Sequence, residues 1–505
     1  MTNPLFDRLF APLADRSAPV LTLADGTTIT GSAFFAMIAR AAGALRACGV
    51  EPGDRVAVQV AKTPEAMAVY GATVAIGAVF LPLNTAYTAA EVEYFVGNAT
   101  PRLLLADPSQ IGALLPVAAK HGARLMALGA DGTGDFSDLA DTQSPDLTVA
   151  ARTEDDLAAF LYTSGTTGRS KGAMLTQSNL LSNAEALVSL WQFTDRDVLL
   201  HALPIFHTHG LFVATHVALL SGASMIFLPG FDLDTMIRFL PQATSVMGVP
   251  TFYTRFLNDP RFNRDLTKDM RLFISGSAPL LAETHIEFEA RTGHRILERY
   301  GMTETNMITS NPYDGERRAG TVGFALPGVE VKVTDPTTAQ ALPRGETGMI
   351  EVRGPNVFKG YWQMPEKTRE ELRDDGFFMT GDLGCVDADG YLAIVGRQKD
   401  LIISGGFNIY PKEIELVLDE QPGVLESAVV GVPHPDFGEG VLAVLVPRPG
   451  ETPDLDAIDA ALKSQLARYK QPKAYVLIDA LPRNTMGKVQ KNALRDQYAT
   501  QLSGT

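Results

Sequence analysis

A short segment in the middle of the chain combines residue types that can bind phosphate groups. Residues 162–172 read Tyr-Thr-Ser-Gly-Thr-Thr-Gly-Arg-Ser-Lys-Gly. Glycines let backbone N–H groups approach an anion closely, hydroxyls add donors, and Arg169 and Lys171 add positive charge. The segment lies between an apolar, strand-like run at 157–161 and a helical pattern that begins near Gln177. We therefore expect a polyphosphate-binding loop rather than a plain surface loop. Its Ser-Lys-Gly order differs from the Gly-Lys-Ser/Thr of the common P-loop.

Two further motifs offer groups that suit a nucleotide. Residues 300–304, Tyr-Gly-Met-Thr-Glu, place a hydroxyl and a carboxylate after a glycine. Thr303 could donate to a phosphate, and Glu304 could bind Mg²⁺ that bridges ATP phosphates. In residues 380–384, Asp382 stands between glycines and could accept hydrogen bonds from ribose hydroxyls. The simpler alternatives are a helix cap for the first motif and an Asx turn for the second.

Two motifs near the C-terminus could contact a ligand that binds later in a reaction. Residues 404–411 contain Gly405-Gly406, where a narrow ligand could approach the backbone, although a hairpin turn would read the same way. Residues 482–488 end in Gly487-Lys488. Lys488 could act as a mobile point charge for a carboxylate and a phosphate, although most terminal lysines are simply solvated.

Composition limits the classes of protein that fit. The 505 residues exceed one hydrophobic core, so two or more domains are expected. The net charge of −15 and the lack of Lys/Arg-rich runs argue against a nucleic-acid or membrane partner. The only cysteines, Cys48 and Cys385, cannot form a disulfide framework or a metal site and suit a reducing cytosol. The uncharged stretch 66–83 is better explained as a packed helix that runs into a buried strand. We expect a cytoplasmic protein.

The elements that must position these motifs alternate along most of the chain. Apolar, strand-like runs are followed by helical patterns, for example 55–60 by 64–76 and 224–228 by 232–240. This alternation predicts an α/β fold with largely parallel sheets. After about Gly323 short strands separated by Gly, Asp and Pro turns predict a small antiparallel or barrel-like subdomain. The charged segment 396–400 then leads to an independent tail, so we place the domain boundary at Lys399.

The five motifs, in this order and spacing, closely resemble those of the ANL superfamily of adenylate-forming enzymes, which includes acyl-CoA synthetases, adenylation domains and firefly-type luciferases. The resemblance covers residues 46–491, including Gly396-Arg397-x-Lys399-Asp400. It implies a large N-terminal domain (1–398) of two α/β subdomains plus a small β-barrel-like subdomain. It also implies a small mobile α+β C-terminal domain (399–505) that carries Lys488 and turns about Lys399. Many relatives have Asp at this hinge position.

The resemblance also implies ligands and roles. ATP, Mg²⁺ and coenzyme A are the expected ligands, with Lys488, Thr303 and Glu304 catalytic and Glu304 on the metal. The CoA channel would include Ser404, Gly405 and Gly406. The residues expected to bind ATP are Thr163, Ser164, Gly165, Thr166, Thr167, Gly168, Lys171, Ser277, Ala278, Pro279, Glu298, Tyr300, Gly301, Met302, Asp382 and Arg397.

The charge of the expected acyl pocket points to a dicarboxylic substrate. Arg299 directly precedes Tyr300, and an arginine in a closed pocket needs an anion. The alternative is a structural Asp or Glu on a neighbouring helix. The segments 201–211 and 297–307 are similar to those of malonyl-CoA synthetases. We therefore expect malonate as the preferred acid, methylmalonate to be tolerated, and acetate and fatty acids to be poor substrates. The side chains expected near the second carboxylate are Arg299, His209, Thr208, His207 and Arg255.

Other functions stay open at this stage. The chain could be an acyl-CoA synthetase for another short, medium-chain or aryl acid, or an adenylation enzyme that loads a carrier protein. A catalytically silent nucleotide-binding protein is the third alternative, although Lys488 and Glu304 are both present. Because relatives are often acetylated on the terminal lysine, a lysine acetyltransferase or deacetylase that acts on Lys488 is a possible partner.

Overall fold

The computed structural model describes residues 2–163, 170–404, 407–484 and 487–502. Its contacts divide the chain into two compact units. The first contains residues 1–330 and 352–378, and the second contains residues 331–351 and 379–505. Within the described ranges, no helix is both long and apolar enough to cross a bilayer.

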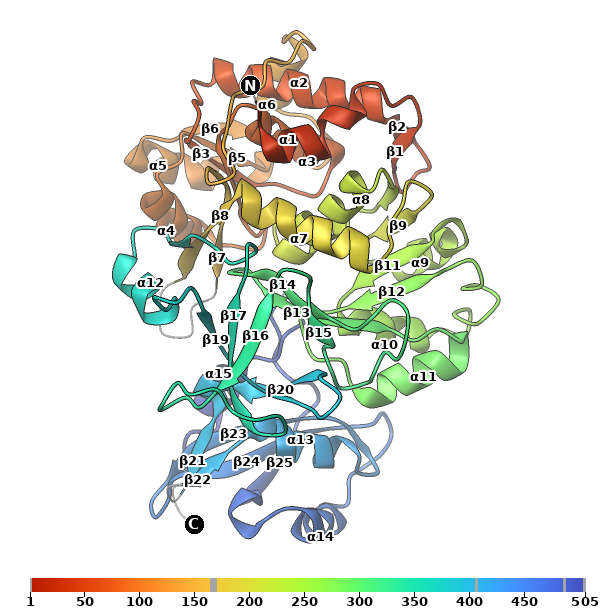
Figure 1. The fold of residues 1–505 in the computed structure, drawn as a ribbon, viewed down its shortest axis with the longest axis vertical. Coiled ribbons are helices and arrows are strands. Elements are labelled where there is room, and N and C mark those ends of the chain that lie inside the picture. The colour runs from red at the N-terminus through yellow and green to blue at the C-terminus, as the bar shows by residue number, and fades with distance from the viewer. Residues whose placement is uncertain (1, 164–169, 405–406, 485–486, 503–505) are drawn as a thin grey trace. The chain divides into compact units, whose positions relative to one another are not determined.

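A seven-stranded sheet in the first unit carries the predicted phosphate-binding segment. Its order is β18-β8-β7-β4-β3-β5-β6, and the five strands from β7 to β6 are parallel (Figure 1). The other two strands are antiparallel to their neighbours: β8 to β7, and β18 to β8. The strands are β3 (Arg55–Gln59), β4 (Val79–Pro82), β5 (Leu103–Ala106), β6 (Arg124–Ala127), β7 (Leu157–Thr163), β8 (Lys171–Thr176) and β18 (Gly360–Tyr361).

A nine-stranded sheet forms the rest of the framework of the first unit. Its order is β15-β14-β13-β12-β11-β9-β10-β1-β2, and it is parallel from β13 to β1. The strands are β1 (Pro19–Thr22), β2 (Thr28–Thr30), β9 (Val198–His201), β10 (Ser224–Phe227), β11 (Ser245–Gly248), β12 (Leu272–Ser275), β13 (Leu297–Met302), β14 (Asn306–Ser310) and β15 (Phe324–Ala325). These two sheets confirm the predicted α/β fold with largely parallel strands.

Helices of the first unit connect and cover these strands. They are α1 (Pro4–Leu9), α2 (Gly31–Ala47), α3 (Pro64–Ala75), α4 (Ala89–Ala99), α5 (Ile111–His121), α6 (Asp135–Asp141), α7 (Gln177–Leu190), α8 (His216–Leu220), α9 (Leu233–Phe239), α10 (Pro250–Leu257), α11 (Ala282–Thr292) and α12 (Pro365–Glu371). Helix α7 begins where the sequence predicts it, because Thr176 and Asn179 form a reciprocal capping box.

The second unit contains two smaller sheets. One has the order β16-β17-β19-β20, with β16 (Glu330–Thr334), β17 (Thr347–Arg353), β19 (Phe378–Val386) and β20 (Leu392–Arg397), and β19 and β20 are antiparallel. The other has the order β22-β21-β24-β23, with β25 beside β24. Its elements are β21 (Ile402–Ser404), β22 (Phe407–Ile409), β23 (Val424–His434), β24 (Gly438–Pro447), β25 (Ala474–Leu477), α13 (Pro411–Asp419), α14 (Leu455–Gln465) and α15 (Lys491–Gln497).

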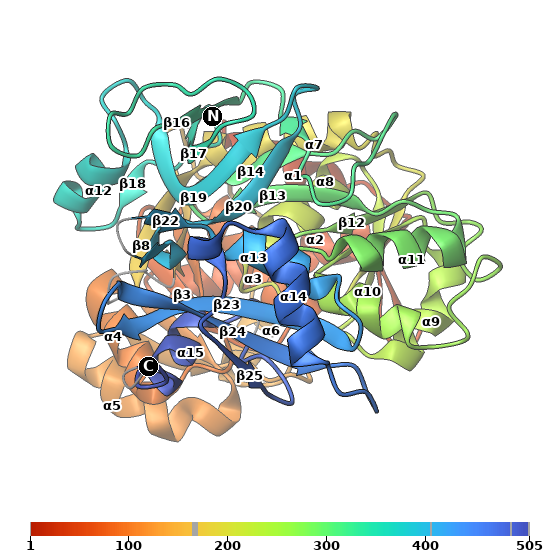
Figure 2. The same ribbon diagram turned by 90° about the horizontal axis from the view of Figure 1, so that it is seen from below.

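The C-terminal sheet has an apolar cluster on each of its two faces. Figure 2 shows its strands β23 and β24 together with α13, α14 and α15. Successive residues of β23 alternate between two apolar clusters, with Val429 in one and Val430 in the other. Side chains of α13 and α14 complete the first cluster, and Leu494 of α15 belongs to the second. The predicted domain boundary at Lys399 falls inside the second unit. That the C-terminal domain turns about Lys399 stays a prediction.

One buried side-chain amide connects α7, which follows the seven-stranded sheet, to β14 of the nine-stranded sheet. Asn183 of α7 donates to the Met307 carbonyl at 2.8 Å and accepts from the Met307 N–H at 3.2 Å. We expect Asn183→Ala to lower the free energy of unfolding by about 1–3 kcal/mol, because it removes the side-chain acceptor of the buried Met307 N–H and one of two donors to the Met307 carbonyl, which keeps the Asn356 amide. Chemical denaturation measures this change. Glu185→Ala on the same helix removes only an exposed ion pair to Arg8 and should cost less than about 1 kcal/mol. Equal losses in both variants would contradict the argument.

Candidate active site

The ends of the predicted phosphate loop are fixed by strand pairing. Thr163, the last residue of β7, pairs with Lys171, the first residue of β8. The Tyr162 hydroxyl donates to Asn98 at 2.6 Å. The backbone N–H of Trp362 donates to the Gly172 carbonyl at 2.8 Å. The predicted loop residues Ser164, Gly165, Thr166, Thr167 and Gly168, together with Arg169, lie outside the described residues.

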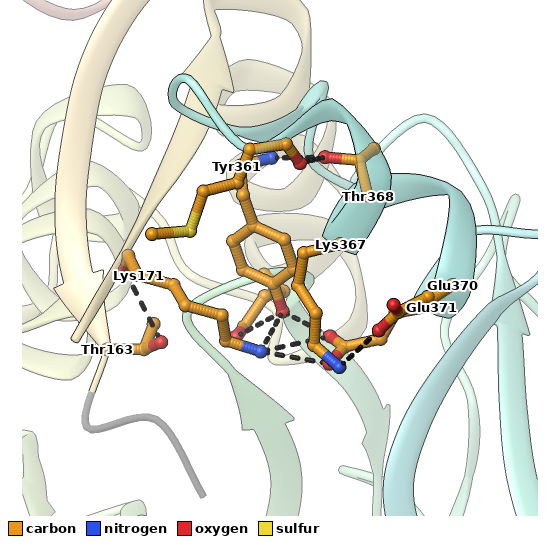
Figure 3. A network of polar contacts seen from close by, with 9 residues as sticks. Thr163, Lys171, Tyr361, Lys367, Thr368, Glu370 and Glu371 are labelled. Atoms are coloured by element: carbon orange, nitrogen blue, oxygen red, sulfur yellow. Dashed lines mark hydrogen bonds and ion pairs between the residues drawn. The ribbon is translucent and has the colours of Figure 1, made fainter. Parts of the chain in front are cut away.

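Lys171 belongs to a buried network of charged groups (Figure 3). Its ammonium lies 2.9 and 3.2 Å from the two carboxylate oxygens of Glu371 and 3.1 Å from the Tyr361 hydroxyl. The Tyr361 hydroxyl also lies 2.6 Å from Glu371 and 3.0 Å from Glu304. Burial, and then the Glu304 charge, raise the pKa of Tyr361, so the phenol keeps its proton. Sequence reasoning missed Tyr361 and Glu371, because a glutamate on a short, charged helix carries no local signal.

Glu304 lies in the turn between β13 and β14 and is buried. Burial raises the pKa of its carboxyl, and the nearby Lys171 charge partly offsets that effect. Among the described residues no group of three or more His, Cys, Asp or Glu could hold a metal. A single buried carboxylate fits the way Mg²⁺ binds to proteins through one or two carboxylates plus substrate phosphates.

Strand β13 separates two sets of predicted residues. Side chains alternate along a strand, so Glu298 and Tyr300 share one face and Arg299 leaves from the other. All three are buried. His285 Nδ1 lies 3.6 Å from the Glu298 carboxylate, and burial raises the pKa of Glu298. The predicted adenine segment Ser277-Ala278-Pro279 follows β12, which runs parallel to β13, whereas Gly301 and Met302 end β13 at a bulge.

Arg299 is a buried cation, and the described residues provide no carboxylate that pairs with it. Its side chain is 3% exposed, and its Nε and Nη2 atoms have no hydrogen-bond partner among the described residues. Burial lowers the pKa of Arg299 to about 9. The guanidinium occupies the space beside Gly276, where an added Cβ would lie 2.4 Å from Arg299 Cζ. The alternative of a structural Asp or Glu partner therefore finds no support in the described part of the chain.

The segment that contains His207 and His209 lies close enough to Arg299 for its charge to act on both imidazoles. His209 begins a π-helical turn (His209–Thr215), a local distortion common at functional sites that the sequence pattern did not reveal. His209 Nδ1 lies 3.2 Å from Ser277 Oγ. Thr208 Oγ1, His209 Nε2 and Ser275 Oγ are buried and have no hydrogen-bond partner among the described residues. Burial and the Arg299 charge lower the pKa of His207 to about 4 and that of His209 well below its usual value.

The π-helical turn is anchored by residues that sequence reasoning missed. His201 Nε2 lies 3.0 Å from the Gly210 carbonyl, and the Thr215 hydroxyl donates to the same carbonyl at 3.0 Å. On its other side, His201 Nδ1 lies 3.0 Å from the buried Lys62 ammonium. Burial lowers the pKa values of both His201 and Lys62.

Arg255 does not join the pocket. It is exposed on α10 and lies over the Phe231 ring, 5.4 Å from its centroid. The buried face of α10 instead presents Tyr253, whose hydroxyl donates to the Ile274 carbonyl. Residues two positions apart on an α-helix point about 200° apart, so Tyr253 and Arg255 lie on different faces of α10. We therefore remove Arg255 from the residues predicted to bind the substrate carboxylate.

The second unit gathers another set of predicted residues. Asp382 and Arg397 are directly opposed on β19 and β20 and form an ion pair at 3.2 Å. Burial and then the Arg397 charge lower the pKa of Lys488 to about 8, whereas Asp382 acts in the opposite direction. Lys399 also lies near Lys488, and burial lowers its pKa. Ser404 ends β21 and is buried, but Gly405 and Gly406 of the predicted CoA channel lie outside the described residues.

The chain is similar to known proteins over most of its length. The AMP-binding enzyme family matches residues 10–362, and the AMP-binding enzyme C-terminal domain matches residues 413–488. A feruloyl-CoA synthase from Amycolatopsis sp is 37% identical over 94% of each chain. A malonate–CoA ligase from Arabidopsis thaliana is 36% identical over 84% of this chain and 75% of its own. The crystal structure of ATP-bound MatB from Rhodopseudomonas palustris is 57% identical, with a TM-score of 0.97 over 99% of this chain and 100% of that chain.

The buried histidines make the folded protein sensitive to acid. We expect the His207 imidazole to stay neutral down to about pH 4 in an NMR titration of the native protein, against about 6.5 for an unfolded histidine. Between these values the unfolded chain binds a proton that the folded chain does not. The free energy of unfolding should therefore fall as the pH falls from 6.5 towards 4. A titration of His207 near pH 6.5 would contradict this expectation.

Proposed function

The chain belongs to the AMP-binding enzyme family, and on that basis we propose that it is an ATP-dependent malonyl-CoA synthetase. The overall reaction is malonate + ATP + CoA → malonyl-CoA + AMP + pyrophosphate. The buried, unpaired guanidinium of Arg299 carries this choice of acid. Similarity to a malonate–CoA ligase and to ATP-bound MatB supports it.

Arg299 would bind the carboxylate of malonate that does not react. A carboxylate accepts two parallel hydrogen bonds from a guanidinium, and Arg299 has unpaired donors at Nε and Nη2. Neutral His207 and His209 add no second positive charge, and Thr208 between them offers a buried hydroxyl that has no hydrogen-bond partner among the described residues. An acid without the second carboxylate would leave Arg299 desolvated and unpaired, which a buried cation tolerates poorly.

ATP would be bound by groups from several elements. Residues 163–171 would hold the β- and γ-phosphates, Tyr300 would stack on adenine, and Asp382 with Arg397 would bind the ribose. Glu304 would hold Mg²⁺, which supplies positive charge to the phosphates when bound. The other residues proposed for the adenine and its surroundings are Ser277, Ala278, Pro279, Glu298, Gly301 and Met302.

The chemistry would proceed in two displacement steps. First, an oxygen of the reacting carboxylate attacks the α-phosphorus of ATP, and the bond to pyrophosphate breaks. Because two anions approach each other, Lys488 and Thr303 are needed to stabilise the developing charge. Second, the CoA thiolate attacks the acyl carbon, and the bond to AMP breaks. We propose that the C-terminal domain turns about Lys399 between the steps and then presents Ser404, Gly405 and Gly406 to CoA.

A CoA ligase for an aromatic acid is the second candidate, since the feruloyl-CoA synthase is as similar in sequence as the malonate–CoA ligase. Its substrate would leave Arg299 unpaired. Loading of a carrier protein would share the first step but not the CoA step. A cytoplasmic location and acetylation of Lys488 remain predictions; the low pKa of Lys488, about 8, favours acetylation because it leaves more free amine at neutral pH.

A competition experiment tests the acid. Malonate, methylmalonate, succinate, acetate, octanoate and ferulate are mixed with Mg-ATP and CoA, and the thioesters are identified by mass spectrometry. We expect malonyl-CoA to dominate, with some methylmalonyl-CoA, because one methyl group is discriminated only about 10–200-fold. In Arg299→Ala we expect malonate kcat/KM to fall by roughly 10⁴-fold, the size of effect seen when a site loses its polar partner.

The exposed arginine of α10 provides a matched control. Arg255→Ala removes the same side chain from the surface and should leave the product pattern unchanged. Undiminished malonate activity in Arg299→Ala would show that the buried guanidinium does not bind the substrate. Dominant feruloyl-CoA would favour the aromatic acid, and pyrophosphate release without any thioester would favour a carrier protein.

The charge of Lys488 should limit the first step at alkaline pH. Its pKa is lowered to about 8, so the ammonium is lost as the pH rises through 8. We expect kcat/KM for ATP in malonate-dependent pyrophosphate release to decline above about pH 8, since this parameter reports the free enzyme. In Lys488→Arg, whose charge persists, the decline should disappear although the rate is lower. A decline that begins only near pH 10.5 would contradict the assignment.

A further inference from the structure

The ammonium of Lys171 is held by a carboxylate and a phenol. It lies 2.9 and 3.2 Å from the two carboxylate oxygens of Glu371 and 3.1 Å from the Tyr361 hydroxyl (Figure 3). The opposite charge of Glu371 strengthens these hydrogen bonds. A polyphosphate that draws Lys171 towards itself must therefore compete with Glu371 for the ammonium.

Glu371 has a second cation within reach. Lys367 lies one turn earlier on α12, and its ammonium is 3.1 Å from Glu371 and 2.8 Å from Glu370. The Tyr361 hydroxyl lies 2.6 Å from the Glu371 carboxylate. Loss of Lys171 would therefore leave Glu371 with an ammonium and a phenol rather than unpaired. This removes the usual obstacle to breaking a sheltered ion pair, which is the cost of the charge left behind.

The exposure of these side chains shows which of the two ion pairs, Lys171–Glu371 or Lys367–Glu370, is the weaker one. Lys171 and Glu371 are 11% and 20% exposed, so their attraction is stronger than that of a surface pair. Glu370 is 63% exposed, and an ion pair at such a site contributes little. Lys367 can therefore move fully from Glu370 to Glu371 at small cost.

We propose that Lys171 exchanges partners during the reaction, leaving Glu371 for the polyphosphate of ATP and returning to it when pyrophosphate departs. Lys367 takes the place of Lys171 in the interval. Glu371 is then a positioning residue that competes with the nucleotide for Lys171 and helps to release pyrophosphate. The inference rests on the proposed function in one respect, namely that Lys171 binds the β- and γ-phosphates.

The test measures binding rather than turnover. The affinities of the whole protein for Mg-α,β-methylene-ATP and for Mg-pyrophosphate are measured by calorimetry, without malonate or CoA. In Glu371→Gln, which cannot hold the ammonium by charge, we expect both ligands to bind about tenfold more tightly. In Lys367→Met, which removes the replacement cation, we expect both to bind about threefold more weakly. These opposite signs follow from exchange, whereas a purely structural role for the network would weaken binding in both variants.

Controls separate exchange from simple repulsion between Glu371 and the ligand. Glu366→Gln removes the same charge from an exposed position of the same helix and should leave both affinities unchanged. In a Lys171→Ala background, Glu371→Gln should have no effect, whereas direct repulsion of the phosphates would persist there. Thermal unfolding checks that each variant folds. Should Glu371→Gln fail to fold, Glu371→Asp, with its shorter reach, should tighten binding about threefold.

Weaker or unchanged binding in Glu371→Gln, or the same tightening in the Lys171→Ala background, would overturn the inference. The outcome is independent of the acid substrate. Tighter nucleotide binding in Glu371→Gln together with failure to form malonyl-CoA would uphold the exchange and reject the proposed function. Malonyl-CoA formation together with weaker binding in Glu371→Gln would uphold the proposed function and reject the exchange.

Discussion

Strand β13 is buried along its first four residues, and this burial imposes a strict alternation of side chains. Arg299 must leave from one face while Glu298 and Tyr300 leave from the other. Arg299 is therefore separated from Glu298 and Tyr300 by the thickness of one strand. A shift of one residue in the pairing of β12 and β13 would exchange the two faces, so the parallel register keeps Arg299 on the opposite face from these two residues.

Much of the framework could be predicted from the sequence because its signals are local. The apolar runs at 55–60 and 224–228 correspond to β3 and β10, and the predicted start of α7 at Gln177 is where the helix begins. Hydrophobic spacing and capping residues act over a few positions, so they survive without knowledge of the tertiary structure. Arg299 was also recognisable, since an arginine next to a nucleotide motif needs an explanation for its charge.

The rest depends on contacts between distant segments. The sequence could not show which way Arg255 points, and the structure places it on the exposed side of α10. The π-helical turn at His209 results from packing around His201 and Lys62, which lie 8 and 147 positions away in the chain. Glu371 meets Lys171 across 200 residues. The roles of residues 164–168, Gly405 and Gly406 stay predictions, since these residues lie outside the described part of the chain.

The close approach of Arg299 to Gly276 has an evolutionary consequence. A side chain at position 276 would occupy the space of the guanidinium, because even a methyl group would lie 2.4 Å from Cζ. The two positions therefore constrain each other: a homologue that gains a side chain at 276 must move the guanidinium or shorten residue 299. Loss of the arginine alone would leave a hole, and gain of the methyl group alone would displace the cation. Descendants that adopt a monocarboxylic acid should therefore carry paired substitutions at 276 and 299, and single intermediates should serve neither substrate well.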